Sequence, residues 1–566
     1  MKSRSRSNVI PNFVVKRSSS VRQDLSPDRS LCHKVKNDKS VRGEKRQNVM
    51  RNLDLVIEEL ASSNSQEHLE HAIESALEAF AHTRTDLHDE EIRLGADIAT
   101  IKLLDRTLAS GKLENLVSLC SILEMVFRCS TEVLQLSYSS NGPEVVALLI
   151  KVIKECLDGM IRGKQVALQS TMKILHRFSS GVRDAKNDMV HNDELLIIIS
   201  EIASKDVGSG TREDSMGIVR NIALLNKQNR IILAGKSCLL DSIVKTALNE
   251  KSHYKVREQC SAIMWYLAME SEKRTHVLFH DGIIESLMKL ASDPYLKTKL
   301  NAVSALGNLA TDPVSKSFLL NYRCGALLDS FLDMFRRSED ADVVRRVGRT
   351  LRFLVNERTA PLIVNHEGFL DGLTDCILAD KKEESYQSAK VINTVSAQIN
   401  SPLPEHDSIL KALTESAFTE QPATGEIIAL TFSEQSTIKE NREVMIDHPD
   451  LLKALAQMVL DKNCTRETME YMVCTAGHLC TVIYSKRKLV NGPILSALGK
   501  VSECNEKLQS VIAGIVLRLA TLPKNRIILG QHSELVACLV KSLRTNGDKQ
   551  EREKVKETIL QLVPLL

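Results

Sequence analysis

The chain has 566 residues, of which 43% are hydrophobic and 26% charged, so it can bury a core over most of its length. Aromatic residues make up only 4%, with a single Trp, and the 24 Gly and 13 Pro are few for this length. Because β-sandwiches and barrels need aromatic and β-branched strands separated by Gly- and Pro-rich turns, the composition argues against them. It favours an all-α protein.

Charge is distributed unevenly along the chain. Residues 1–50 carry 13 Lys and Arg against 4 Asp and Glu, which leaves 62 basic and 68 acidic residues in 51–566. This basic arm is rich in Ser and poor in large apolar groups, so burial cannot offset its ordering entropy and we expect it to be disordered. The mildly acidic body argues against general nucleic-acid binding, which needs a strongly basic surface.

The arm contains predicted phosphorylation sites. Ser18, Ser19 and Ser20 follow two basic residues, as in a basophilic-kinase site, and Ser26 precedes a proline, as in a proline-directed site. A phosphate would add nearly two negative charges and weaken any electrostatic contact of the arm. The arm itself stays open to three interpretations: a silent extension, a nuclear import signal, or attachment to an acidic surface.

Cysteine usage and hydropathy indicate the compartment. The 13 Cys are scattered without a CxxC pair, many of them inside apolar helical runs, which is typical of small buried side chains in a reducing environment. The sequence shows no stretch resembling a signal peptide and no long uncharged run. We therefore expect an intracellular protein of the cytoplasm, the nucleus or both.

A short phrase recurs along the chain. ALGNLATD, centred on Leu309, has clear counterparts at intervals of 40 to 45 residues or at three times that interval. We call the central apolar residue of each phrase the anchor and its helix the anchor helix. The clear anchors are Ile222, Leu267, Leu309, Leu354, Leu479 and Leu519, and less regular ones are Met125, Leu175, Val395 and Leu430.

Each anchor is followed by the same local plan. After Leu309, SKSFLL predicts a short helix, NYRCGA a break, and LLDSFLDMFRR a longer amphipathic helix that leads to the next anchor helix. Gly235 and Gly282 fall at the equivalent breaks elsewhere, where a left-handed residue is favoured. Three helices in about 42 residues cannot bury their own apolar faces, but stacked neighbours can bury them.

The period and this plan resemble the armadillo repeat, and GNLA at 307–310 sits where armadillo units carry such a motif on their third helix. The resemblance covers most of 115–545. It implies one right-handed superhelical solenoid of about nine or ten repeats over 51–566, with 51–110 as a helical N-terminal cap. The overlapping HEAT period leaves room for two-helix units in places.

In armadillo proteins the third helices line a concave groove that binds extended peptides or other proteins. The resemblance implies that the residue just before each anchor projects into this groove, where an Asn amide can pair with the N–H and C=O of a peptide. The alternative is that these Asn side chains bond to a neighbouring repeat. The predicted groove residues are Asn221, Tyr266, Asn308, Arg349, Arg352, Phe353, His478 and Arg518.

An arginine cluster is the strongest local prediction. Arg345, Arg349 and Arg352 have i, i+4, i+7 spacing and share one helix face. They could bind an acidic or phosphorylated peptide through bidentate hydrogen bonds, or form a solvated face balanced by the acidic residues just upstream.

Importin-α-type adaptors also join a basic arm to an armadillo array, and KNDKSVRGEKRQNV at 36–49 resembles the end of their arm. Those adaptors place a Trp four residues before the groove Asn. Here the corresponding positions are Gly217 and Ser304, and the single Trp, Trp265, lies elsewhere in its motif. The groove therefore lacks the stacking platforms of a nuclear-signal receptor.

No enzyme signature is visible. The sequence has no phosphate-binding loop, no dinucleotide fingerprint, no nucleophile elbow and no HExxH, so we expect no catalytic residue, cofactor or metal. His68, His71, His82 and His88 read as surface residues of amphipathic helices. The leading prediction is a non-enzymatic scaffold that binds protein partners. The alternatives are a nuclear transport adaptor and an accessory subunit of a larger complex.

Overall fold

The computed structural model describes 116–128, 131–158, 162–205, 207–224, 226–379, 381–399, 407–545 and 549–562, with four single positions between 101 and 108. The chain divides into two compact units, 1–99 and 100–566, and the described residues belong to the second. The predictions for the basic arm, including its four serines, lie outside the described residues. So do the predictions for nearly all of the 51–110 cap.

The described residues form α-helices and short 3-10 turns, with no strand among them, which confirms the all-α prediction. Ten helices carry the recurring phrase and are the anchor helices. They are α4 (Leu116–Arg128), α6 (Arg162–Gly181), α9 (Ser209–Ala223), α12 (Tyr254–Ala268), α15 (Leu296–Leu309), α18 (Ala341–Leu354), α21 (Lys382–Gln398), α23 (Pro422–Thr437), α26 (Arg466–Leu479) and α29 (Gln509–Ala520).

The second helix of each unit precedes the anchor helix, except that the last one, α31, precedes the final helix of the chain's described part. The second helices are α5 (Thr131–Leu157), α8 (Asp193–Ser204), α11 (Ser237–Leu248), α14 (Ile283–Ala291), α17 (Ala326–Arg337), α20 (Phe369–Leu378), α22 (Asp407–Ser416), α25 (Leu451–Leu460), α28 (Ile494–Cys504) and α31 (Ser533–Thr545).

A shorter first helix opens most units. The first helices are α7 (Arg183–His191), α10 (Lys227–Ala234), α13 (Ser271–Leu278), α16 (Pro313–Asn321), α19 (Ala360–Val364), α24 (Lys439–Asp447), α27 (Ser485–Asn491) and α30 (Pro523–Gly530). In the described residues two units have no first helix, that of α5 and α6 and that of α22 and α23, and α32 (Lys549–Leu562) ends the series.

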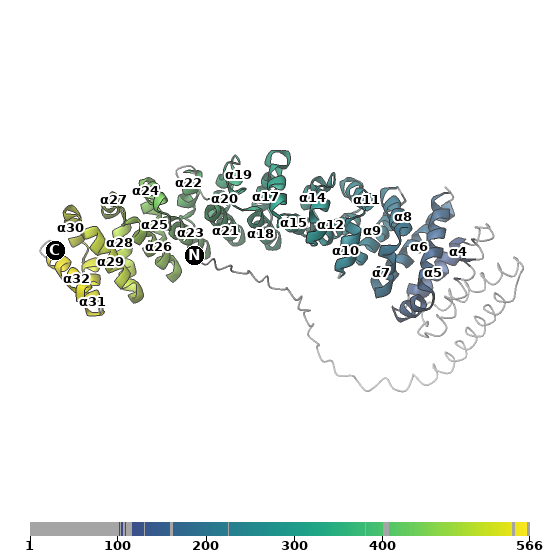
Figure 1. The fold of residues 1–566 in the computed structure, drawn as a ribbon, viewed down its shortest axis with the longest axis horizontal. Helices are drawn as coiled ribbons and strands as arrows, with labels where there is room; N and C mark the ends of the chain where they lie inside the picture. The colour runs from purple at the N-terminus through teal and green to yellow at the C-terminus, as the bar shows by residue number, and fades with distance from the viewer. Residues whose placement is uncertain are drawn as a thin grey trace, which may run out of the picture. The chain divides into compact units, whose positions relative to one another are not determined.

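The helices stack in chain order. Each anchor helix packs against the anchor helix before it and the one after it, from α4 through to α29. Figure 1 shows the anchor helices following one another from α9 onward, with second helices such as α11, α14 and α17 beside them. The clear anchors are fully buried between these neighbours, which confirms the predicted helical repeat solenoid.

The break between first and second helices follows the prediction at one glycine and departs from it at another. Gly282 has φ 79°, and the residues of the predicted NYRCGA break form a 3-10 turn (Tyr322–Gly325) in which Gly325 has φ 90°. Gly235 instead has φ −83°, so the prediction of a left-handed residue there is wrong. In this unit α10 ends at Gly235 in a right-handed conformation, and α11 follows directly.

Helix α23 corrects the predicted register. Asn525 Nδ2 donates to the carbonyl of the anchor Leu519, and Asn441 Nδ2 donates in the same way to the carbonyl of Gln435. The anchor position of α23 therefore belongs to Gln435, not to the half-buried Leu430. Gln435 is buried and satisfied, because its Nε2 donates to Ser396 O at 2.9 Å and its Oε1 accepts from Asn441 Nδ2 at 2.9 Å.

The same argument moves the anchor of α6 by one turn. Asn221, just before the anchor of α9, bonds to Ser179, and His478, just before the anchor of α26, bonds to Ser436. Ser436 directly follows Gln435, so Phe178, which directly precedes Ser179, occupies the anchor position of α6. Leu175 is equally buried but lies one turn earlier.

Asn–Arg pairs on first helices close the C-termini of the preceding anchor helices. The last carbonyls of a helix lack intrahelical donors. Asn229 Nδ2 donates to Ile222 O at 3.3 Å, and Arg230 Nη1 donates to Ala223 O at 3.2 Å. Asn441–Arg442 and Asn525–Arg526 repeat the arrangement.

The corrected register makes a testable prediction. Gln435→Ala removes a buried side chain with two hydrogen bonds, so we expect it to destabilise the solenoid by about 2–3 kcal/mol. Leu430→Ala removes a half-buried side chain and should cost about 1 kcal/mol. Urea unfolding followed by far-UV circular dichroism measures both. A larger loss for Leu430→Ala than for Gln435→Ala would contradict the register.

The capping role of the Asn–Arg pairs is also testable. Asn229→Ala leaves Ile222 O without its donor, and we expect a loss of about 1–2 kcal/mol in the same unfolding measurement. Gln228→Ala, at an exposed neighbouring position of α10, is the matched control and should change stability by less than about 0.5 kcal/mol. Equal effects of the two substitutions would rule out the cap.

Candidate protein-binding surface

The solvent-facing side chains of the anchor helices form the surface on which the predicted groove residues lie. With the corrected register, one residue of each anchor helix stands just before the anchor. From α9 to α29, leaving out α21, these residues are, in order, Asn221, Tyr266, Asn308, Phe353, Glu434, His478 and Arg518. These positions and those one and two turns earlier define the anchor-helix face.

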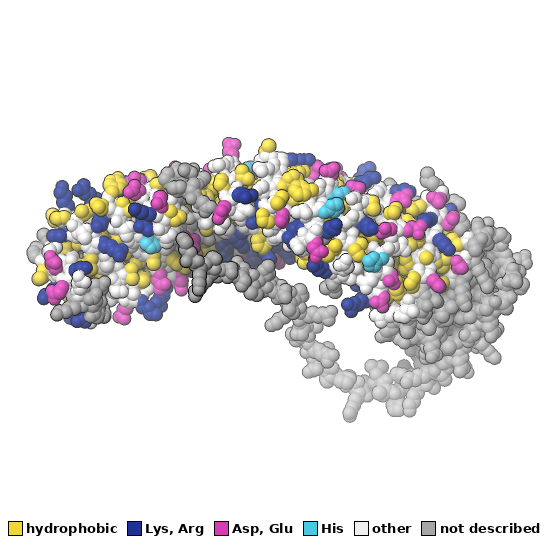
Figure 2. All heavy atoms as spheres, in the orientation of Figure 1, with side chains coloured by type: hydrophobic (Ala, Val, Ile, Leu, Met, Phe, Trp, Pro, Cys, Tyr) yellow, Lys and Arg dark blue, Asp and Glu magenta, His cyan; other side chains and the backbone are white. Residues whose placement is uncertain are grey.

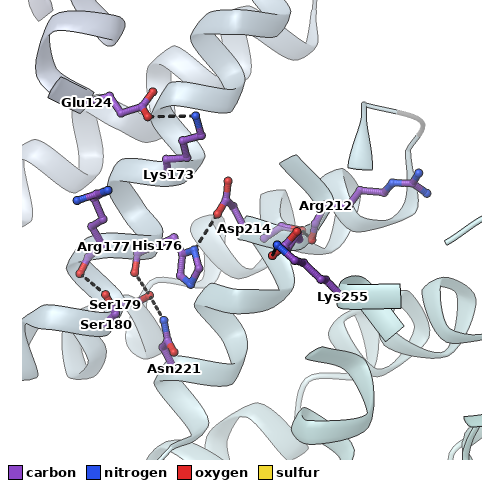
Figure 3. A network of polar contacts seen from close by, with 12 residues as sticks. Glu124, Lys173, His176, Arg177, Ser179, Ser180, Arg212, Asp214, Asn221 and Lys255 are labelled. Carbon is purple, nitrogen blue, oxygen red and sulfur yellow. Dashed lines mark hydrogen bonds and ion pairs between the residues drawn. The ribbon is translucent and has the colours of Figure 1, made fainter. Parts of the chain in front are cut away.

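Four of the predicted groove residues bond to neighbouring repeats: Arg352 and Arg518, described below, and Asn221 and His478. Asn221 is 7% exposed, and its Nδ2 donates to Ser179 Oγ of α6 at 3.1 Å (Figure 3). His478 is half-buried, and its Nδ1 lies 2.8 Å from Ser436 Oγ of α23. Both side chains connect successive anchor helices. The alternative interpretation, that a predicted groove residue bonds to a neighbouring repeat, therefore holds for Asn221 and also for His478.

Asn308 differs from Asn221. Its side chain is half-buried on α15, and within the part of the chain that the structure describes its amide makes no hydrogen bond. An amide that faces solvent with free donors and an acceptor can pair with a peptide backbone. Tyr266, on the preceding helix, is also half-buried and stacks on Trp265 with ring centroids 5.3 Å apart.

The three arginines of the predicted cluster have different surroundings. Arg345 is paired with Asp342 of the same helix. Arg352 is half-buried and donates from Nη1 to Gln387 Oε1 of α21 at 2.8 Å, and burial lowers its pKa. Arg349 is exposed, lies 5.0 Å from the ring centroid of Phe353, and makes no ion pair within the described ranges.

Helix α21 adds a second cation over an aromatic ring. Lys390 Nζ lies 4.0 Å from the ring centroid of Tyr386, and this lysine too has no ion pair among the described residues. The sequence reasoning missed both residues, although their i, i+4 spacing was a readable signal. We call Arg349, Phe353, Tyr386 and Lys390 the basic–aromatic patch. Figure 2 shows Lys and Arg side chains on the side of the stack that carries these helices.

The absence of a Trp ladder has a structural cause. A Cβ at Gly217 would lie 2.7 Å from His176 Nε2, and the other nitrogen of that ring bonds to Asp214 Oδ1 at 2.7 Å. A side chain at this position would therefore require the His176 ring to move. Trp265 is already covered, since the Arg346 guanidinium lies 5.9 Å from its ring and Nη1 of that arginine donates to Leu300 O at 3.3 Å.

The end of the face around α26 has its own electrostatics. Burial lowers the pKa of His478, and the nearby charges of Arg442 and Arg518 lower it further. Arg518 is exposed, and its Nη1 donates to Gly477 O at 3.4 Å.

The described residues contain neither a cluster of metal ligands nor a membrane-spanning helix. Among the described residues, no three His, Cys, Asp or Glu side chains gather as metal ligands would. No helix in the same residues is both long and apolar enough to cross a membrane.

No protein-family model matches the sequence, and no curated protein matches it. Several solved structures are similar in fold. An engineered protein shares 14% identity with a TM-score of 0.43, covering 73% of this chain and 98% of its own. A structure from work on a phosphorylation switch in the interaction between cadherin and β-catenin shares 13% identity with a TM-score of 0.48, covering 90% and 99%. A second engineered protein shares 19% identity with a TM-score of 0.35, covering 44% and 98%.

These similarities are too weak to define a family. The assignment to the class of all-α helical repeat solenoids therefore rests on the stacking of the helices themselves.

The lowered pKa of His478 predicts a pH dependence of stability. Between its folded pKa and the ordinary value near 6.5, the unfolded chain binds a proton that the folded chain does not, so stability falls as pH drops through this window. His478→Gln should lose less stability than the wild type between pH 7.5 and 5.5 in urea unfolding. Arg518→Gln should also reduce the loss, because it removes a charge that disfavours protonation. Identical pH profiles for all three proteins would exclude the effect.

Proposed function

We propose that this protein is a non-enzymatic, armadillo-type scaffold of the cytoplasm or nucleus that binds an extended, acidic segment of a partner protein on its anchor-helix face. The observation that carries the proposal is the basic–aromatic patch. Arg349 and Lys390 each lie over an aromatic ring and lack an ion pair in the described residues. A cation without a carboxylate partner on a solvent-facing helix is available to one from another chain.

The chemistry of the patch suits a carboxylate or phosphate ligand. Arg binds either anion through two parallel hydrogen bonds, and an aromatic ring beneath the cation restricts its motion before the ligand arrives. Rings of this kind also supply the apolar contact area that interface hot spots use. Asn308, next to the patch on α15, offers an amide for the backbone of the same segment.

Burial of thiols is in keeping with an intracellular setting. Burial raises the pKa of Cys120 and of Cys260 to about 12, so both stay protonated and unreactive. Such cysteines act as small core residues.

The transport-adaptor alternative has less support. Lysines of a nuclear signal need open aromatic slots, whereas Trp265 is covered by Arg346 and a side chain at Gly217 would meet the ring of His176. The unpaired cations of the patch would also repel such a basic signal.

Charge reversal tests the proposal. A fluorescein-labelled peptide of alternating Asp and Ser is the probe, and fluorescence anisotropy measures its binding to the full chain. We expect Arg349→Glu/Lys390→Glu to weaken binding at least tenfold, about 1.4 kcal/mol, because two attractive contacts become repulsive.

The control must match the change in net charge. Arg487→Glu/Lys524→Glu alters two exposed basic residues on the first helices α27 and α30. This variant should bind the probe within about twofold of the wild type. Equal loss in both variants would mean that only net charge, or the basic arm, attracts the peptide, and the proposed site would be wrong.

A further inference from the structure

The anchor-helix face carries an acidic cluster beside the basic–aromatic patch. Four glutamates lie on two helices that pack together, Glu426 and Glu434 on α23 and Glu467 and Glu470 on α26. Burial raises the pKa of Tyr471 of α26, and the charges of these four glutamates raise it further. We call these residues the acidic patch: Glu426, Glu434, Glu467 and Glu470.

The two patches occupy equivalent positions on the face. Glu434 stands just before the anchor of α23, as Phe353 does in α18. Glu426 lies two turns before Glu434 in α23. Tyr386 holds the equivalent position in α21, two turns before the residue that precedes the anchor Val395. The carboxylates therefore continue the rows of the basic–aromatic patch.

Contacts join the patches into one surface. Arg352 of α18 donates to Gln387 of α21, and Asn393 of α21 donates from Nδ2 to Glu434 Oε2 of α23 at 3.0 Å. Helix α23 then packs directly on α26. The charge of this continuous surface reverses from positive on α18 and α21 to negative on α23 and α26.

Few of these charges are neutralised by ion pairs among the described residues. Glu470 pairs with Arg466 at 3.1 Å. Glu426, Glu434 and Glu467 have no ion pair in the ranges that the structure describes, like Arg349 and Lys390 on the other side. Leu430, which the corrected register places on the face between Glu426 and Glu434, adds an apolar contact to the acidic half.

Resting on the proposed function, we infer that the partner is an extended segment with two charged blocks in a fixed order along its length, an acidic block for α18 and α21 and a basic block for α23 and α26. Packed helices lie about 9 Å apart, and the centres of the two patches are two helix steps apart, so they are separated by about 18 Å. An extended chain advances about 3.3 Å per residue, which places the block centres five or six residues apart.

Four labelled peptides of equal length test the inference on the full chain by fluorescence anisotropy. The block peptide has Asp-Glu-Asp, three neutral residues and Lys-Arg-Lys, and it is made in both chain directions because the patches recognise side chains. The mixed peptide has the same composition with the charges alternating. The acidic peptide replaces the basic block with Ser and Ala.

The better block peptide should bind at least tenfold more tightly than the mixed peptide and more tightly than the acidic peptide. Glu426→Lys/Glu467→Lys should abolish its advantage over the acidic peptide while leaving binding of the acidic peptide intact or stronger. Glu440→Lys/Glu443→Lys, which changes two exposed residues of the first helix α24, is the matched control and should preserve the advantage.

The outcomes separate this inference from the proposed function. If block, mixed and acidic peptides bind alike, and all lose affinity in Arg349→Glu/Lys390→Glu, the acidic-segment function holds and the charge order is wrong. If the acidic peptide binds that variant as tightly as the wild type, the proposed function itself fails. Loss of the advantage in the Glu440→Lys/Glu443→Lys control would also overturn the charge order.

Discussion

Burial of each anchor helix between its two neighbours is the constraint on which the rest of the structure depends. A single unit cannot cover this helix, so every anchor is desolvated only when the next unit is in place. The anchor then fixes the phase of its helix, and the phase decides which side chains face solvent. The surface available to a partner is thus determined by the core pattern. A shift of the anchor changes which residues face solvent. In α23, taking Gln435 as the anchor places Leu430 and Glu434 on the anchor-helix face.

Polar contacts between units limit what the surface can offer. Asn221 and His478 stand where a groove residue was expected, yet they bond to Ser179 and Ser436 of the preceding anchor helix. A buried amide or imidazole needs such a partner, because leaving it unsatisfied costs more than the bond returns. A position on the face therefore becomes a binding position only where its side chain has no partner inside the stack. Asn308, Arg349 and Lys390 meet that condition within the described residues.

The sequence alone predicted the period, the all-α class and the helix plan, because these follow from the spacing of apolar residues. It failed where a polar residue replaces an apolar one. A search for recurring apolar residues does not find Gln435, so the anchor of α23 was predicted at Leu430. With that anchor, Glu426 and Glu434 were not predicted to lie on the binding face. Lys390 and Tyr386 were missed for a related reason, since the less regular phrase around Val395 gave no firm phase. The Asn–Arg caps recur in the sequence, but only the carbonyls that they reach reveal their role.

Ion pairs between successive second helices set apart the unpaired charges of α18, α21, α23 and α26. In five consecutive second helices, from α8 to α20, an acidic residue near the start meets a basic residue of the following unit, at N···O separations from 2.6 to 3.1 Å. The pairs are Asp193–Lys236, Asp241–His280, Glu285–Arg323, Asp329–His366 and Asp371–Lys411. The partner alternates among Lys, His and Arg while the contact is kept, so the position requires a nitrogen that can donate to the carboxylate and not a particular residue. Exposed pairs of this kind are individually weak, but they leave the second-helix side with its charges matched. On the anchor-helix face, similar pairs join the earlier anchor helices, as in Lys173–Glu124, Lys255–Glu213 and Lys297–Glu258. Farther along, Arg349, Lys390, Glu426, Glu434 and Glu467 have no ion pair among the described residues and are available to another chain.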